Sequence, residues 1–276
     1  MDAHFVEGGG GIKIHARETG LSTGMPILFI HGWSQHHMCW AKQFESALAD
    51  SHRLVAVDLR GHGQSDTPKD AESYSHGDLW AEDINSIIKT LELERPVLVG
   101  WSYGGLVISD YLRRYGDEDI SGINFVGAAV GIGPKWFGSH IGPGFLENAP
   151  PACSDDQVVA LQAIQRFLHV CFEQPLDAKD MELAMGWNML VQPFVRASLI
   201  QREDDFTPEL ERLQKPSLVS FGDRDSIVLP KMAETIIAHV PYGQSSEYKG
   251  VGHAPFCEDA NRFNDELAAF SRSVLN

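Results

Sequence analysis

The sequence predicts a doubly wound α/β protein, in which helices cover both faces of a mostly parallel β-sheet. Short apolar runs that suit buried parallel strands alternate with amphipathic helical stretches. Their order along the chain is strand, helix, strand, helix, which is typical of right-handed crossover units. With 276 residues, the chain is long enough to bury a large core without disulfides.

Five apolar segments are predicted as strands of the sheet interior. Each is apolar on both faces and ends near a Gly, His or Asp, as expected for strands covered on two sides. An amino-terminal hairpin is expected around the four glycines at residues 8–11. The predicted strands span residues 26–30, 53–58, 96–100, 123–130 and 217–221.

The stretches between these strands predict helices that pack against the sheet. In residues 79–91, Ile84, Ile87, Ile88 and Leu91 recur at the spacing of one helix face. The other predicted helices span residues 106–115, 233–240 and 263–274.

The alternation stops in residues 131–206. This segment begins with a Gly/Pro-rich stretch, continues with helical patterns at 158–172 and 181–189, and has no convincing strand. Long excursions of this kind usually serve a site. We therefore expect a helical cap inserted between two parts of one core, residues 1–130 and 207–276. A lateral helical layer without functional contacts is the alternative.

The composition argues against nucleic-acid and membrane partners. The chain carries 38 acidic and 22 basic residues, a net charge of −16, and has no basic stripe to attract a phosphate backbone or an anionic lipid. No apolar run approaches the eighteen or so residues of a membrane span, and the amino terminus does not resemble a secretory leader. We expect a cytoplasmic protein.

No cofactor or metal is expected. The four cysteines form no C-x-x-C pair, which indicates reduced thiols, and neither a dinucleotide-binding G-x-G-x-x-G after a strand nor a P-loop is present. His36 and His37 are adjacent, but no H-E-x-x-H or spaced carboxylate completes a ligand set. These two histidines and His52 are expected on the surface. The cysteines are Cys39, Cys153, Cys171 and Cys257.

Two segments match G-x-S-x-G, at residues 20–24 and 100–104, and their contexts differ. A nucleophile elbow needs a strand that turns sharply into a helix, so that the serine hydroxyl projects above the sheet. Only Ser102 has a predicted strand before it and a predicted helix after it. Ser22 lies between a hairpin and a strand, so a turn is expected there.

A serine hydroxyl needs a histidine base and an acid that fixes the imidazole tautomer. His253 lies in a glycine-rich loop after an expected strand and before the last helix, where α/β sheets gather their ligands. Asp223 and Asp225 follow the predicted strand 217–221. Both are candidates for the acid.

With these loops in place, the chain resembles the α/β-hydrolase superfamily along its length apart from the cap. In that family the order is nucleophile, acid, histidine, and Ser102, Asp225 and His253 obey it. The resemblance favours Asp225, because the family's acid is the later of two such carboxylates, followed closely by an apolar residue and then Pro. Asp223 stays the alternative.

The oxyanion formed on attack needs pre-aimed backbone N–H groups. One donor is expected from Tyr103, directly after the nucleophile, and the family resemblance points to Trp33 for the other. Residues 58–66 are similar to a second family segment and are expected to support the loop at residues 31–33.

The resemblance also narrows the reaction. A serine nucleophile argues against epoxide hydrolases and haloalkane dehalogenases, which use a carboxylate at that position. The motifs are similar to those of small carboxylesterases of the pimeloyl-ester methylesterase kind and of cofactor-free haloperoxidases or perhydrolases, although the Pro typical of perhydrolases is Ser34 here. We expect a serine esterase acting through an acyl-enzyme. The alternatives are a perhydrolase, a lactonase and a ligand receptor on a hydrolase scaffold.

The cap indicates what kind of ester fits. Most of its aromatic residues, such as Phe167, are expected to form the cap's own core, while some face an apolar cleft that selects acyl or aryl groups. Residues 131–206 contain ten carboxylates and five Lys or Arg, which disfavours an acidic carrier protein. Small free esters are therefore the expected substrates. The sequence leaves the oligomeric state open.

Overall fold

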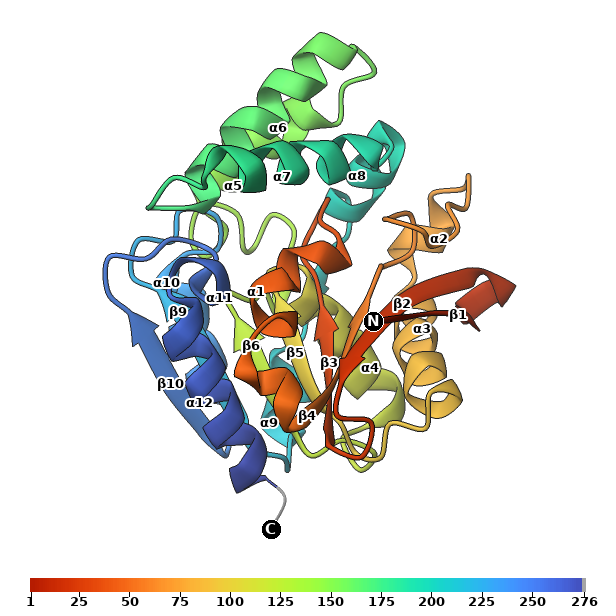
Figure 1. Cartoon of the computed structure of the whole chain (residues 1–276). Coiled ribbons are helices and arrows are strands. Elements are labelled where there is room, and N and C mark those ends of the chain that lie inside the picture. The colour runs from red at the N-terminus through yellow and green to blue at the C-terminus, as the bar shows by residue number, and fades with distance from the viewer. Residues whose placement is uncertain (275–276) are drawn as a thin grey trace.

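The computed structural model describes residues 1–274, and an eight-stranded sheet lies at its centre. Its strands are β1 (Asp2–Glu7), β2 (Lys13–Gly20), β3 (Met25–Ile30), β4 (His52–Val57), β5 (Val97–Trp101), β6 (Gly122–Val126), β9 (Ser217–Gly222) and β10 (Gly243–Tyr248). The spatial order is β1-β2-β4-β3-β5-β6-β9-β10 (Figure 1). β1 and β2 form the predicted antiparallel hairpin, and all pairs from β4 to β10 are parallel.

Helices cover both faces of the sheet, as predicted. One face carries α3 (Gly77–Thr90), α4 (Gly104–Tyr115) and α10 (Pro230–His239), and the other carries α1 (Ala41–Phe44), α11 (Pro255–Glu258) and α12 (Ala260–Ser273). Alternate residues of β3 enter the two apolar clusters, Leu28 on one face and Phe29 on the other. The fold also contains α2 (Glu72–Ser75) and α9 (Thr207–Arg212). No helix within residues 1–274 is long and apolar enough to cross a membrane.

The predicted strand at residues 123–130 is too long. β6 ends at Val126, because Gly127 turns the chain with a φ of 46°, in the left-handed region that favours glycine. The Gly127 N–H donates to Ser220 O at 2.8 Å, which fixes this turn against β9. The chain therefore leaves the sheet beside the carboxyl end of β5.

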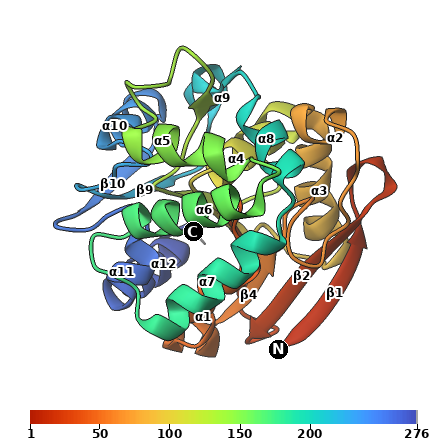
Figure 2. The ribbon, with the colours of Figure 1, turned by 90° about the horizontal axis from the view of Figure 1, so that it is seen from above.

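Four helices lie over the carboxyl ends of the strands (Figure 2). They are α5 (Pro143–Ala152), α6 (Gln157–Cys171), α7 (Ala178–Leu190) and α8 (Pro193–Ile200). The sequence predicted α6 and α7 but neither α5 nor α8. Pro143 occupies the first turn of α5, where a missing N–H is harmless. Ala149 and Ala152 are buried in the same apolar cluster as residues of α6, so packing stabilises a Pro-rich helix.

A short ladder lies at the two ends of the predicted insertion. β7 (Gly131–Ile132) pairs antiparallel with β8 (Asp204–Asp205), so the expectation of no strand in residues 131–206 is wrong at both ends. The Phe206 N–H extends the pairing to Val130 O at 3.0 Å. This ladder joins the two segments that connect helices α5 to α8 to the sheet. The division into core and cap stays a prediction.

Candidate active site

Ser102 lies at a sharp turn between β5 and α4. Its φ is 56°, which is rare for a residue with a side chain. Its N–H donates to Val126 O at 3.0 Å, and its carbonyl accepts from the N–H groups of Gly105 and Ala129 at 2.9 and 3.0 Å. These bonds hold the strained strand–turn–helix geometry that exposes a nucleophile. Ser22 lies in a turn before β3, at the opposite end of the parallel strands.

Glycines surround Ser102 because side chains would collide there. A Cβ at Gly100 would lie 2.8 Å from Gly104 O, and a Cβ at Gly104 would collide with the carbonyl oxygen of Ile30. A Cβ at Gly32 would lie 2.9 Å from the Cβ of Ser102. The elbow and the loop after β3 are therefore in direct contact.

Asp225 and His253 form a buried pair at the carboxyl ends of β9 and β10. His253 Nδ1 donates to Asp225 Oδ2 at 2.6 Å, and the two residues are 1% and 3% exposed. Asp225 Oδ1 accepts from the N–H groups of Ile227 and Val228 at 2.8 and 3.0 Å. The His253 N–H donates to Cys171 O at the end of α6. The carboxylate is thus locked in orientation, and it holds the proton of His253 on Nδ1.

Asp223, the alternative acid, lies elsewhere on the same loop. Its Oδ1 accepts from the Gly250 N–H at 2.6 Å, and its carboxylate lies 3.9 Å from Arg224 and from Lys249. This residue caps the loop that precedes His253. The geometry favours Asp225 as the imidazole's partner.

Residues next to the Ser102 turn contact His253. The indole of Trp101, next to Ser102, donates to His253 O at 2.9 Å. A Cβ at Gly127 would lie 3.1 Å from His253 Nδ1 and 3.3 Å from Asp225 Oδ2. Within residues 1–274, however, Ser102 Oγ forms no hydrogen bond. Its contact with His253 Nε2 stays a prediction, and such contacts are often long in unliganded enzymes.

Trp33 and Tyr103, the predicted oxyanion donors, line the same cavity as Ser102. Tyr103 precedes the first turn of α4, where a helix favours negative charge. Trp33 follows Gly32, which contacts Ser102, and Ser34 holds a positive φ of 61° in the same loop. In the described part of the chain, neither N–H donates to a protein acceptor. Their role as oxyanion donors stays a prediction.

A small apolar cavity adjoins Ser102. Its volume is about 20 Å³, enough for a single water molecule, so a substrate must displace side chains or the helices above it. Phe145 lines this cavity, as was predicted for some of the aromatic residues in the cap without naming which. Ile227 and Val228 also line it, and no sequence pattern indicated this, although they come two and three residues after Asp225. The cavity is lined by Trp33, Ser102, Tyr103, Leu106, Ala129, Ile132, Ile141, Phe145, Ile227 and Val228.

Residues 58–66 support the loop after β3, as predicted. The Leu59 N–H donates to His31 Nε2 at 3.1 Å, and His31 Nδ1 donates to Gly32 O at 2.8 Å. Asp58 accepts from the N–H and from Nδ1 of His37, both at 2.9 Å. The loop that carries Trp33 is therefore tied to the end of β4.

The expectation of surface histidines is wrong. His36 and His52 are buried and His37 is half-buried. From the sequence, no carboxylate was expected to complete a metal-ligand set with the adjacent histidines. In the structure Asp58 lies beside them, and possible ligand atoms of His15, His37 and Asp58 lie within 4.8 Å of one another.

In the structure, imidazoles and backbone N–H groups occupy the carboxylate of Asp58. Its Oδ2 accepts from His15 Nδ1 at 2.7 Å and from the Gln64 N–H at 3.1 Å, while its Oδ1 accepts two bonds from His37. A carboxylate offers about four lone-pair positions, and all four are used. This cluster is a hydrogen-bonded support for the loop.

The buried histidines predict a pH dependence of stability. Burial lowers the pKa of His36 and of His62 to about 4, and it lowers the pKa of His31 well below its ordinary value. Between about pH 6.5 and pH 4 the unfolded chain therefore binds more protons than the folded one, so stability falls as the pH falls. Between pH 7.5 and 5.5, each histidine should lower the free energy of unfolding by about 1 kcal/mol. Urea unfolding at both values measures this, and equal stabilities would contradict it.

The fold and this constellation define a class, the hydrolases built on a parallel sheet with a nucleophile elbow. The sequence model of the alpha/beta hydrolase family matches residues 27–266, and the chain belongs to this family.

Known proteins similar to the chain agree with both groups that its motifs resemble. The crystal structure of the esterase RhEst1 from Rhodococcus sp. ECU1013 is 35% identical, with a TM-score of 0.93 over 99% of this chain and 100% of that one. A non-heme haloperoxidase of Rhodococcus erythropolis is 26% identical over 98% of this chain and 99% of its own. A pimeloyl-[acyl-carrier protein] methyl ester esterase of Vibrio cholerae is 26% identical over 90% and 94%.

Proposed function

We propose that this hydrolase cleaves small carboxylic esters with Ser102 as nucleophile, His253 as general base and Asp225 as the acid that orients it. The observation that carries the proposal is the buried 2.6 Å bond from His253 Nδ1 to Asp225, beside a serine with a strained backbone. With the proton held on Nδ1, the Nε2 lone pair is free to accept the Ser102 proton. Similarity to esterases supports the reaction class.

The reaction proceeds in two steps. Ser102 Oγ attacks the ester carbonyl while its proton passes to His253, and the oxyanion accepts from the N–H groups of Trp33 and Tyr103. The carbon–oxygen bond to the alcohol then breaks, and the alcohol leaves with that proton. Water attacks the acyl-enzyme, gives a proton to His253, and releases the acid as Ser102 is regenerated.

A fluorophosphonate tests the nucleophile directly. Attack by Ser102 forms an oxygen–phosphorus bond and expels fluoride, and the expected result is one added phosphonyl group per chain. Peptide mass spectrometry should place it on Ser102, with the unlabelled Ser22 of the second G-x-S-x-G segment as the internal control. Loss of p-nitrophenyl butyrate hydrolysis should parallel the labelling. Hydrolysis that continues in a fully labelled protein would refute the assignment.

Perhydrolysis is the second candidate, favoured by the similarity to a non-heme haloperoxidase. Hydrogen peroxide would replace water in the second step and release a peracid from the same acyl-enzyme. Ser34 stands where perhydrolases usually have Pro, which weakens this candidate. Peroxide-dependent halogenation in the presence of acetate distinguishes the two, because a pure esterase gives none.

A further inference from the structure

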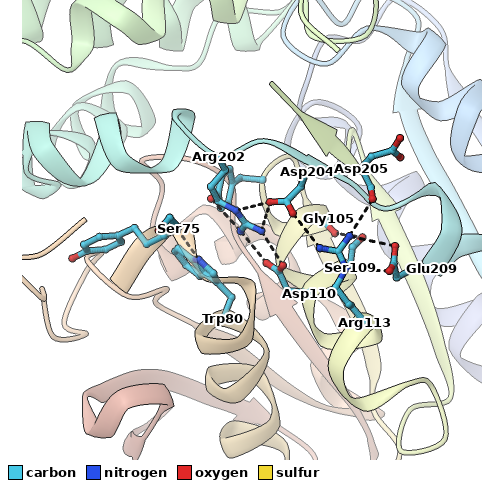
Figure 3. Close-up of polar contacts among 12 residues, drawn as sticks. Ser75, Trp80, Gly105, Ser109, Asp110, Arg113, Arg202, Asp204, Asp205 and Glu209 are labelled. Carbon is cyan, nitrogen blue, oxygen red and sulfur yellow. Dashed lines mark hydrogen bonds and ion pairs between the residues drawn. The ribbon is translucent and has the colours of Figure 1, made fainter. Parts of the chain in front are cut away.

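Within residues 1–274 three arginines are buried, and two of them have carboxylate partners. Arg60 donates to both oxygens of Asp83 at 2.8 Å, and Arg202 donates to both oxygens of Asp110 at 2.9 and 2.8 Å. Arg202 also contacts Asp204, so its charge is fully enclosed by acceptors (Figure 3). In both cases a carboxylate compensates the positive charge of the buried guanidinium.

Arg196 of α8 is the exception. It is 1% exposed, yet no described residue accepts a hydrogen bond from any of its guanidinium nitrogens, and Nε and Nη1 are completely buried. Burial lowers the pKa of Arg196, with the Cys153 thiol acting weakly in the opposite direction. An arginine nevertheless stays protonated in proteins. Among the described residues no carboxylate therefore compensates this buried charge.

Arg196 lies beside the proposed oxyanion loop. Its carbonyl oxygen accepts from the indole N–H of Trp33 at 3.1 Å, and Trp33 lines the cavity next to Ser102. The charge of Arg196 also contributes, after burial, to the low pKa of His62, in the segment that supports this loop. Arg196 therefore contacts, through its carbonyl, the loop that carries the proposed oxyanion donor Trp33, while its charge acts on His62 and on Cys153.

Other polar atoms in this region are also buried without a protein partner. They are Ser34 Oγ and Gln35 Nε2, directly after Trp33, and Asn188 Oδ1 in α7. Gln35 connects the loop after β3 to α7, because its Oε1 accepts from the indole N–H of Trp187 in α7 at 3.1 Å. Unpaired buried polar groups at one interface are typical of a place where a polar ligand or water completes the hydrogen bonds.

We propose that Arg196 is an anion subsite that binds a carboxylate carried by the ester substrate, an inference that rests on the proposed esterase function. A single planar guanidinium matches one carboxylate in charge and in fork geometry. The surrounding cap is net acidic, with ten carboxylates against five Lys or Arg in residues 131–206, which disfavours a doubly charged phosphate. The apolar lining at Phe145 and Ile141 suits the hydrocarbon between ester and carboxylate. Short monoesters of dicarboxylic acids have this composition.

Matched esters test the subsite. We expect kcat/KM for monomethyl glutarate to exceed that for methyl pentanoate, an uncharged ester of similar length, by about 10- to 100-fold. The Arg196→Met substitution should lower this ratio to about one, because methionine fills similar space without charge or donors. Arg166→Met, an exposed change on α6 with the same loss of charge, is the control and should leave the ratio unchanged. Equal rates for the two esters in the wild-type enzyme, or an unchanged ratio in Arg196→Met, would overturn the proposal.

Binding separates this proposal from the proposed function. Pentanoate, a monoanion with one carboxylate and a short apolar chain, should raise the thermal unfolding midpoint of the wild-type protein in proportion to the logarithm of its concentration, and should not raise that of Arg196→Met. This measurement needs no turnover, so it can succeed even if no ester is hydrolysed. If Arg196→Met does not fold, Arg196→Lys, which keeps the charge but not the fork, should give a smaller rise than the wild type. A midpoint that pentanoate leaves unchanged in the wild-type protein would count against the subsite.

Discussion

The Ser102→Ala substitution should reduce kcat for p-nitrophenyl butyrate by about 10⁶-fold, as loss of the nucleophile does in a serine hydrolase. The residual rate would come from the oxyanion donors and from substrate binding alone. Because the elbow is held by backbone bonds of residue 102, which alanine can form equally well, the fold should be retained. Steady-state kinetics, with circular dichroism as a check of folding, measures both effects.

Ser22→Ala is the matched control for this experiment. Ser22 has the same G-x-S-x-G context but lies in a turn before β3, with no helix after it. Its substitution should leave kcat within about twofold of the wild type, since exposed turn positions away from the site contribute little. Near-native hydrolysis by Ser102→Ala would remove the proposed mechanism, and a large loss in Ser22→Ala would show that the motif was assigned to the wrong segment.

The features that the sequence predicted are those encoded within a few neighbouring residues. The elbow at Ser102 was recognisable because strand, glycines and helix follow one another in the chain. The end of β6 was not, since its turn depends on Gly127 adopting a positive φ, which no neighbouring pattern required. Local sequence thus predicted the order of the elements better than their limits.

The features that the sequence missed depend on contacts between distant segments. Asp58 bonds to His15, 43 positions earlier in the chain, and to His37, and His36 lies 3.8 Å away, so two histidines expected on the surface belong to a largely buried cluster. Arg196 gave no signal either, because an unpaired charge is visible only once all neighbours are placed. Both cases concern buried polar groups, whose state is decided by tertiary structure rather than by periodicity.

The Asp225→Asn substitution should lower kcat by about 10⁴-fold with little change in KM. Asp225 Oδ1 already accepts two backbone N–H groups, so the oxygen of an asparagine would take that position. Its NH₂ group would then face His253 Nδ1 and donate to it. The imidazole would carry its proton on Nε2, and it could no longer accept the proton of Ser102. The expected loss thus arises from the wrong tautomer in an almost unchanged structure.

Asp223→Asn is the control that distinguishes the two candidate acids. Asparagine keeps an oxygen that can accept from the Gly250 N–H, the bond that Asp223 makes at 2.6 Å. The loop before His253 should therefore hold its shape, and kcat should fall by less than about tenfold. The dependence of kcat on pH, measured for Asp223→Asn and for Asp225→Asn, is a second readout. Only the change at the partner of His253 should alter the apparent pKa of this general base. If Asp223→Asn were the more damaging change, the bond from His253 to Asp225 would not be the one used in catalysis.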